Sequence, residues 1–325
     1  YYNPSVSNVD WIDGYSGDYR TNKGIAPADY QVVWLSAWVR EFGIDGFRCD
    51  TAKHVEPYRW GQLKVACQKA LEKWRVDTGK VDNTGAKDWD ENFWMTGECF
   101  GWTSTSGQGD YYTTGKFDSM INFSFNGSAG SGTSSSYPNQ STWSSYLSIN
   151  NNADSDGNGN RNNVLTYISS HDTKLCRANN QTEVGTMLQL TPGGIQIYYG
   201  DETNRPQAYT GCGDSDMATR GDFNWNEADG ALATHWGKVG QFRKFNPAVG
   251  AGTGTAMKRT YSGAAGDNKV AISISSTSVD VSGLWDDGTT VYNWYDGKSA
   301  VVSGGTAVFG SSSASMSTPI LVSDR

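Results

Sequence analysis

An arginine and an aspartate stand two residues apart in the stretch GFRCD, residues 46–50. Side chains two residues apart on a β-strand project from the same face, so this spacing predicts that Arg48 and Asp50 lie side by side. A guanidinium beside a carboxylate favours the ionised carboxylate. An ionised carboxylate fixed at the end of a strand suits a nucleophile, although an isolated pair of this kind is more often a structural ion pair.

Further acidic residues follow other predicted strands. Glu98 ends the segment 93–98, and the pair His171 and Asp172 follows the segment 163–169. In an α/β barrel the carboxyl ends of the strands carry the active site. Three carboxylates brought together there can divide the roles of acid, base and nucleophile, because their environments differ. The alternative for any one of these acids is a helix cap or an ion ligand.

The elements that must position these acids alternate along the chain. One helix is predicted over residues 27–42, where apolar side chains recur at helical spacing at Leu35, Trp38, Val39 and Phe42. The other predicted elements are helices at 58–75, 141–149, 181–191 and 231–245, strands at 44–49, 93–98, 117–125 and 163–169, and a strand within 193–202. Such alternation favours a parallel sheet or an α/β barrel.

The last part of the chain has a different pattern. Short alternating runs at 270–275, 290–297 and 318–323 are separated by Gly, Asp and Ser. This pattern predicts a small antiparallel β module. The expected domains are therefore 1–249, part of an α/β barrel, and 250–325, an antiparallel β domain.

The composition excludes some classes of partner. The net charge is −8, whereas a nucleic-acid-binding face is basic, so no nucleic-acid partner is expected. No apolar run approaches the ~20 residues of a membrane-spanning helix, so no membrane partner is expected either. The chain opens at Tyr1 on polar sequence without the pattern of a signal peptide, which indicates a mature chain or a fragment.

The chain has five cysteines, so at least one has no partner within it. Cys49 and Cys99 lie on predicted strands and are expected to pack in the interior. Cys176 and Cys212 lie in predicted loops, where they either form a disulfide or stay reduced.

Several segments together resemble the signature regions of one enzyme family. GFRCDTAKH (46–54), TGE (96–98) and SSHD (169–172) resemble the second, third and fourth signature regions of the family 13 glycoside hydrolases, the α-amylases. YYGDE (198–202) resembles a further signature on the eighth barrel strand. The resemblance covers about residues 28–245. It implies a (β/α)8, or TIM, barrel followed by a small antiparallel β-sandwich, and it is closest to bacterial periplasmic members, which implies a secreted or periplasmic protein.

The resemblance also implies roles for the three acids. Asp50 would be the nucleophile that forms a glycosyl-enzyme ester, and Glu98 would be the general acid and then the general base. Asp172 would hold sugar hydroxyls and stabilise the transition state. The implied function is a retaining α-amylase that hydrolyses α-1,4-glucosidic bonds of starch or maltodextrins. An α-glucan transglycosylase shares the covalent intermediate, and a non-catalytic glucan-binding fragment is the alternative outside the enzymes.

Six further residues are expected to bind the glucan substrate or to orient the acids. They are Arg48, Lys53, His54, Trp102, His171 and Arg205. Of these, Trp102 either stacks on a sugar ring or packs in the core, and Arg205 is a candidate only because it follows YYGDE.

The sequence offers two candidate calcium sites. The resemblance implies a structural Ca²⁺ that takes the backbone carbonyl of His54. The second candidate is a loop with the pattern D-x-[DN]-x-[DN]-G, whose candidate ligands are Asp154, Asp156, Asn158 and Asn160. A solvated acidic turn is the alternative, because the twelfth position is Leu165 rather than a bidentate Glu.

The barrel is expected to be incomplete in this chain. The five predicted parallel strands correspond by resemblance to strands 4–8, and five strands cannot close an eight-stranded barrel. The family's first signature region, an Asp-containing strand that ends in Asn-His, has no match. We therefore expect an N-terminal fragment or a second chain to supply barrel strands 1–3.

Overall fold

The computed structural model describes most of the chain in two compact units. The described residues are 26–79, 92–101, 109–123, 125, 132–134, 143, 164–177, 180–209, 211, 215–263, 265–310 and 313–324. The first unit comprises the described residues up to Glu98 and those from Gly109 to Asp118, and the second comprises the others. Within these ranges, no helix has the length and apolar character that a membrane span requires.

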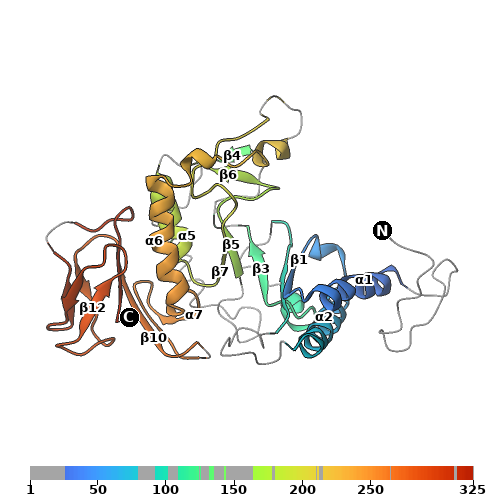
Figure 1. Ribbon diagram of the computed structural model, residues 1–325, viewed down its shortest axis with the longest axis horizontal. Helices are drawn as coiled ribbons and strands as arrows, with labels where there is room; N and C mark the ends of the chain where they lie inside the picture. The colour runs from blue at the N-terminus through green and yellow to red at the C-terminus, as the bar shows by residue number, and fades with distance from the viewer. Residues whose placement is uncertain are drawn as a thin grey trace. The chain divides into compact units, whose positions relative to one another are not determined.

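Two long helices and a pair of parallel strands dominate the first unit (Figure 1). Its elements are α1 (Pro27–Phe42), β1 (Gly46–Cys49), η1 (Ala52–His54), α2 (Pro57–Asp77), β2 (Trp94–Gly97) and α3 (Gly109–Thr113). α1 starts with Pro27 at the first helical position, and Asp29 accepts a hydrogen bond from the Ala26 N–H at 3.1 Å. It ends at Gly43, whose φ of 67° is a conformation that glycine adopts readily. The helices and strands predicted for this part of the chain are confirmed, with shorter strands than expected.

The apolar stripe that predicts α1 is largely exposed. Of its four side chains only Val39 is buried, whereas Trp38 and Phe42 are 55% and 60% exposed and stack with ring centroids 5.3 Å apart. The buried face of α1 consists of Val33, Ser36 and Val39. Helical spacing therefore predicts the helix correctly, but burial depends on which element packs against each face.

The second unit contains three parallel strands in the order β3-β5-β7, which are β3 (Ser119–Asn122), β5 (Val164–Tyr167) and β7 (Gly194–Gln196). Their register pairs Met120 with Val164 and Leu165 with Gly194. With β1 and β2, which are also parallel, all five predicted strands are present. A further parallel pair, β4 (Gly132–Ser134) and β6 (Lys174–Cys176), was not predicted because three residues are too few to show alternation.

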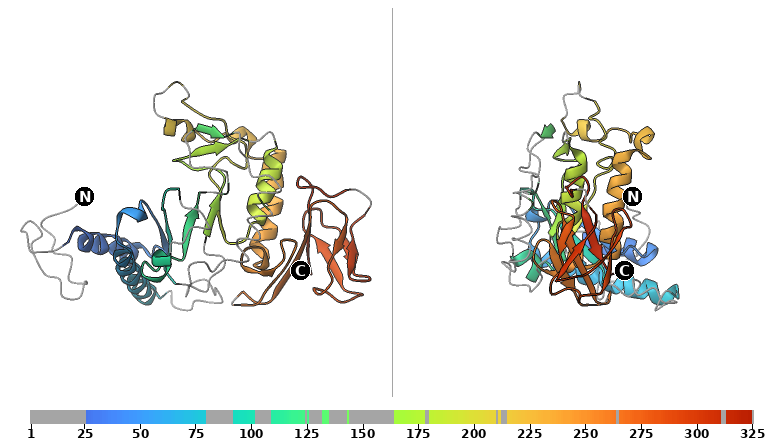
Figure 2. Two further views of the ribbon diagram at one scale, coloured as in Figure 1. Left: turned by 180° about the vertical axis from the view of Figure 1, so that it is seen from behind. Right: turned by 90° about the vertical axis from the view of Figure 1, so that its left-hand side faces the viewer.

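Helices α5 (Gln181–Leu190) and α6 (Ala231–Phe245) lie side by side in the second unit (Figures 1 and 2). Gly185 permits this packing, because a Cβ there would lie 2.3 Å from the indole of Trp236. α6 has the predicted bounds, and α5 ends one residue earlier than predicted. The shorter helices are η3 (Ser215–Thr219), η4 (Trp225–Glu227) and α7 (Ala248–Ala251). The predicted helix 141–149 lies outside the described residues except for Trp143.

An antiparallel six-stranded sheet and a two-stranded sheet form the C-terminal part of the second unit. The larger sheet has the order β13-β12-β15-β10-β9-β8, and the smaller pairs β11 with β14. The strands are β8 (Thr253–Gly254), β9 (Lys258–Tyr261), β10 (Asn268–Ser273), β11 (Ser278–Asp280), β12 (Thr290–Asn293), β13 (Ser299–Val301), β14 (Thr306–Val308) and β15 (Ile320–Ser323).

Successive side chains of β10 enter two different cores. Val270 and Ile272 share a core with Phe242 of α6, whereas Ala271 shares a core with Val279 of β11. This is the alternation expected of a strand buried on both faces. The antiparallel pairing predicted here is confirmed, and the domain boundary between 249 and 250 stays a prediction.

Two arginines, of which Arg259 is buried, bind backbone carbonyls at the end of α5. Arg243 donates to the carbonyl of Gln189 at 2.9 Å, and Arg259 donates to that of Leu190 at 2.8 Å. Burial lowers the pKa of Arg243 to about 10 and that of Arg259 to about 9. Both remain charged at neutral pH and satisfy carbonyls that a helix end leaves without an intrahelical partner.

Cys49 and Cys99 are buried, as predicted. Burial raises the pKa of the Cys49 thiol to about 12, so this thiol is a poor nucleophile. The prediction that Cys176 lies in a loop was wrong, because this residue is buried in β6. Cys212 lies outside the described residues, so the pairing of the two stays untested.

A tight turn follows β7. Gly200 has a φ of 87°, and its carbonyl accepts the N–H of Arg205 at 2.8 Å. A Cβ on Gly200 would lie 2.5 Å from the Cβ of Arg205. Glycine is therefore required here both for backbone conformation and for space.

Substituting Gly200 by alanine should destabilise the second unit by about 2–4 kcal/mol, because backbone strain and overpacking add. The matched control is Gly266→Ala, since Gly266 has a φ of 84° and no atom within 4 Å of its Cβ position. The control should lose only about 1 kcal/mol from strain. Urea unfolding measures both, and equal losses would contradict the packing argument.

Asp201 is fully buried beside β7. It accepts hydrogen bonds from the Ser169 hydroxyl, from Arg177 Nη1 at 3.2 Å and from the Tyr198 N–H at 3.3 Å. Burial raises its pKa to about 6, and these hydrogen bonds and the charge of Arg177 offset the burial only in part. The Asp201 carboxyl thus binds a proton more tightly in the folded chain than in the unfolded chain, where its pKa has the ordinary value of 3.8.

The stabilising contribution of Asp201 should therefore be complete below about pH 4 and should be lost as the pH rises through about 6. Asp201→Asn cannot titrate. The free energy of unfolding of the wild type minus that of Asp201→Asn should rise by up to about 3 kcal/mol between about pH 7.5 and about pH 4. Urea unfolding at both pH values measures this difference. A difference that does not change with pH would show that Asp201 titrates normally.

Candidate active site

Two predicted acids emerge at the same end of neighbouring strands in the first unit. β1 and β2 are parallel, with Cys49 opposite Gly97. Asp50 and Glu98 are therefore the first residues beyond the two strands. The ladder continues past them, because the Glu98 N–H donates to the Cys49 carbonyl at 2.9 Å and the Ala52 N–H donates to the Glu98 carbonyl at 2.7 Å.

A single guanidinium binds both of these carboxylates. Arg48 Nη1 donates to Asp50 Oδ1, and Arg48 Nη2 donates to Glu98 Oε1 at 2.8 Å. The other oxygen of Glu98 accepts the N–H of Thr51 at 3.1 Å. The expected contact between Arg48 and Asp50 is thus present, and the second contact, with Glu98, was not foreseen. It depends on the register between β1 and β2, which spacing within one strand does not show.

The two carboxylates occupy different environments. The side chain of Asp50 is 66% exposed, whereas that of Glu98 is 6% exposed. Two carboxylates joined by one cation but differing in solvation can take different roles in one reaction.

Lys53 and His54 lie on the exposed surface of η1, directly after Asp50. The turn that carries them is fixed, because the His54 N–H donates to the Thr51 carbonyl at 2.9 Å and Thr51 has a φ of 46°. Their predicted contacts with substrate stay predictions.

The third predicted acid lies in the second unit, after β5. Asp172 Oδ2 lies 2.9 Å from His171 Nε2, and Asp172 Oδ1 lies 3.1 Å from Arg220 Nη2. The Ser170 hydroxyl accepts the N–H groups of Asp172 and Thr173, at 3.3 and 3.2 Å, and so fixes the turn. Sequence reasoning missed Arg220, because no local pattern links it to a residue 48 positions earlier.

Arg205 requires a correction. It was expected to contact the substrate, but its side chain has no exposed surface. Its guanidinium donates instead to the backbone carbonyls of Tyr199, Thr219 and Gly221, at 3.1, 2.8 and 3.2 Å. An arginine in a polar loop suggests exposure, but here the chain folds back over it and supplies carbonyl partners.

The other predicted site residues lie outside the described part of the chain. They are Trp102 and the calcium-loop residues Asp154, Asp156, Asn158 and Asn160. Within the described part, no three His, Cys, Asp or Glu side chains are grouped so that they could hold a metal ion. The calcium sites therefore stay predictions.

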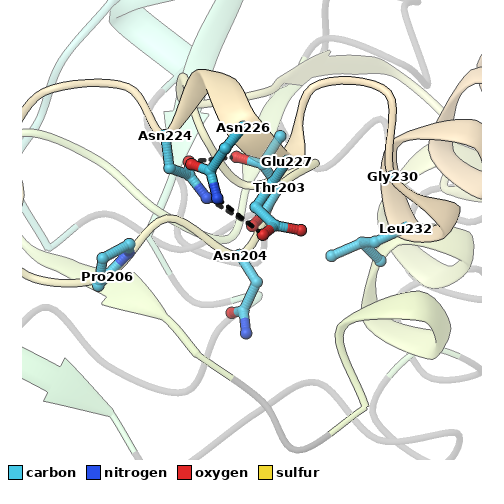
Figure 3. A pocket seen from close by; sticks show the side chains of 8 residues that line it. All are labelled: Thr203, Asn204, Pro206, Asn224, Asn226, Glu227, Gly230 and Leu232. Carbon is cyan, nitrogen blue, oxygen red and sulfur yellow. Dashed lines mark hydrogen bonds between the residues drawn. The ribbon is translucent and has the colours of Figure 1, made fainter.

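A pocket of about 490 Å³ lies among the segments after β7 and around η4 (Figure 3). Its polar groups bind one another. Asn224 Oδ1 accepts from the Thr203 hydroxyl at 2.6 Å, and Asn226 Nδ2 donates to Glu227 Oε1 at 3.0 Å. None of the predicted site residues lines this pocket, so it is not the site of the predicted chemistry.

Comparison with known proteins gives a family match over most of the chain. The model of the alpha-amylase catalytic domain matches residues 21–238. The periplasmic alpha-amylase of Escherichia coli (strain K12) is 40% identical over 260 residues, which cover 79% of this chain and 34% of that protein. The alpha-amylase of Streptomyces lividans is 28% identical over 218 residues, covering 59% of this chain and 20% of that protein. The chain thus spans about a third or less of the length of these relatives.

Solved structures show the same fold. A crystal structure of an Anoxybacillus alpha-amylase has a TM-score of 0.58 at 18% identity and covers 91% of this chain and 62% of that one. The alpha-amylase of Geobacillus thermoleovorans, complexed with acarbose, has a TM-score of 0.57 at 17% identity and covers 91% and 63%. At these identities the likeness shows the fold alone, the TIM barrel of the amylases. Because the family model extends over the strands that carry all three acids, the chain belongs to the alpha-amylase family of glycoside hydrolases.

Proposed function

We propose that this chain carries the catalytic residues of a retaining α-amylase, which hydrolyses α-1,4-glucosidic bonds of starch and maltodextrins through a covalent glycosyl-enzyme intermediate. The observation that carries the proposal is the guanidinium of Arg48, which binds Asp50 and Glu98 at the ends of β1 and β2. A retaining glycosidase needs two carboxyl groups about 5–5.5 Å apart, one as nucleophile and one as acid. A shared cation at the ends of two neighbouring strands holds such a pair together.

In the first step Asp50 attacks the anomeric carbon of the sugar. The bond from that carbon to the glycosidic oxygen breaks, and protonated Glu98 gives its proton to the departing oxygen. The products of this step are a glycosyl ester on Asp50 and a free hydroxyl on the shortened glucan.

In the second step ionised Glu98 takes a proton from water, and the water oxygen attacks the anomeric carbon. The ester bond to Asp50 breaks, so Asp50 is again a carboxylate and Glu98 is again protonated. The greater exposure of Asp50 suits the residue that must reach the sugar. A sugar hydroxyl in place of water would give transglycosylation, which product analysis distinguishes.

The proposal also assigns roles to the other predicted site residues. Asp172 and His171 bind the ring hydroxyls of the sugar at the cleavage site, and Asp172 stabilises the positive charge of the transition state. Lys53 and His54 bind the sugar on the leaving side. The acarbose complex of the Geobacillus thermoleovorans protein supports an oligosaccharide ligand, and the periplasmic relative supports an exported protein.

The proposal also covers the missing barrel strands and a bound calcium ion. The five parallel strands act as strands 4–8 of the barrel, and an N-terminal fragment or second chain supplies strands 1–3. A structural Ca²⁺ binds either the backbone carbonyl of His54 or the loop that contains Asp154 and Asp156. The missing strands and the His54 calcium site rest on the resemblance of the signature segments to the family, whereas the calcium loop rests on its own pattern D-x-[DN]-x-[DN]-G.

Glu98→Gln tests the proposal directly. It should lower kcat on maltooligosaccharides about 1,000-fold, because the amide cannot supply or remove the proton. The matched control is Glu41→Gln, which removes an exposed glutamate of α1 and should leave kcat unchanged. Retention of more than about a tenth of kcat in Glu98→Gln would contradict the assignment. A wild-type protein that binds glucan without cleaving it would leave the binding fragment as the function.

The stereochemistry of the first product tests the covalent intermediate. Proton NMR recorded during hydrolysis should show the α-anomer before mutarotation, because two displacements at the same carbon retain its configuration. Early appearance of the β-anomer would indicate a single displacement and would exclude Asp50 as a nucleophile.

A further inference from the structure

Three side chains that follow β7 hold a later loop by its backbone. These residues, Tyr198, Tyr199 and Arg205, are called the clamp here. The Thr219 carbonyl accepts hydrogen bonds from Arg205 Nη2 at 2.8 Å and from the Tyr198 hydroxyl at 3.1 Å. The Gly221 carbonyl accepts hydrogen bonds from Arg205 Nη1 at 3.2 Å and from the Tyr199 hydroxyl at 2.7 Å.

Arg220 lies between these two fixed carbonyls. Its Nη2 lies 3.1 Å from Asp172 Oδ1, and its Nε donates to the His171 carbonyl at 3.3 Å. The Thr219 hydroxyl donates to the same carbonyl at 2.8 Å. The loop therefore binds both the carboxylate of Asp172 and the backbone just before it.

We propose that Arg220 is a positioning residue that holds the Asp172 carboxylate in the orientation needed by the sugar ring, and that the clamp seats Arg220 there. This inference rests on the proposed function, in which Asp172 contacts substrate. One oxygen of Asp172 is held by His171 and the other by Arg220. A carboxylate fixed through both oxygens needs little reorganisation when the transition state forms.

A role in stability alone explains this arrangement poorly. The side chains of Arg220 and Asp172 are 42% and 30% exposed, and ion pairs exposed to this degree contribute little to folding. The centre of the clamp beneath the pair is buried, because Arg205 has no exposed surface. Its guanidinium carbon lies 4.1 Å from the ring centroid of Tyr199, which is itself 40% exposed. A rigid support under a half-exposed pair is the arrangement expected of a positioning role.

The test compares Arg220→Gln, Arg220→Lys and Arg40→Gln in the full protein acting on maltooligosaccharides. Arg220→Gln should lower kcat at least about tenfold and leave the unfolding midpoint unchanged, and Arg220→Lys should recover part of kcat through its remaining charge. Arg40→Gln is the control, because it removes a partly exposed guanidinium that pairs with Asp77 and should change neither quantity. Wild-type kcat in Arg220→Gln would overturn the proposal.

A double variant tests whether Arg220 acts through Asp172. In an Asp172→Asn background, adding Arg220→Gln should lower kcat/KM by less than about twofold, because the carboxylate that it positions is gone. A full additional loss would overturn the proposal. Wild-type activity in Asp172→Asn would instead refute the proposed function, so the two failures are distinguishable.

NMR spectroscopy tests the position of Arg220 without a measurement of activity. His171 is one of three histidines, and its ring protons can be assigned in the NMR spectrum by comparison with His171→Gln. Arg220→Gln should shift these resonances, and so should the combined Tyr198→Phe and Tyr199→Phe variant, whereas Arg40→Gln should not. Unmoved resonances in Arg220→Gln would show that Arg220 is not seated against this pair.

Discussion

The contact on which the proposed chemistry depends is the guanidinium of Arg48 between two carboxylates. β1 and β2 end together, so Asp50 and Glu98 are brought to one place by the register of a parallel pair. A cation that binds both carboxylates offsets the repulsion between them whenever both are ionised. Arg48 supplies this cation from within β1, where its backbone is fixed by pairing with β2. The strand pair therefore sets both the position of the acids and the charge that keeps them together.

The second unit uses arginine in a related way, but mostly against backbone. Arg205 and Arg243 each bind several backbone carbonyls, and Arg205 has no exposed surface. A buried guanidinium is tolerated when most of its N–H groups find acceptors, and its planar geometry then fixes several chain segments relative to one another. Arg220 differs because it is half-exposed and faces a carboxylate. It joins the buried backbone network to the one acid of this unit that the family resemblance assigns to catalysis.

Patterns within short segments of the sequence predicted the helices, the strands and the acids at the strand ends. Apolar spacing predicts the bounds of α6 and the presence of the five parallel strands, although not their exact lengths. The acids at the ends of β1, β2 and β5 follow from the positions of these strands. The exposure of Trp38 and the burial of Arg205 were not predictable, because both depend on segments distant in sequence. The same holds for the contact between Arg48 and Glu98, 50 residues apart, and for that between Arg220 and Asp172. Spacing along the chain shows which residues can act, and tertiary contacts decide which of them meet.

We propose that Asp50 is the residue that forms a bond to the sugar. The most direct test is to trap the intermediate with a fluorinated glycosyl fluoride that forms the ester faster than water cleaves it, and then to map the labelled peptide by mass spectrometry. We expect one sugar on the peptide that contains Asp50, and no label in Asp50→Asn. A label on another residue, or an active enzyme that forms no ester under these conditions and inverts its product, would contradict it.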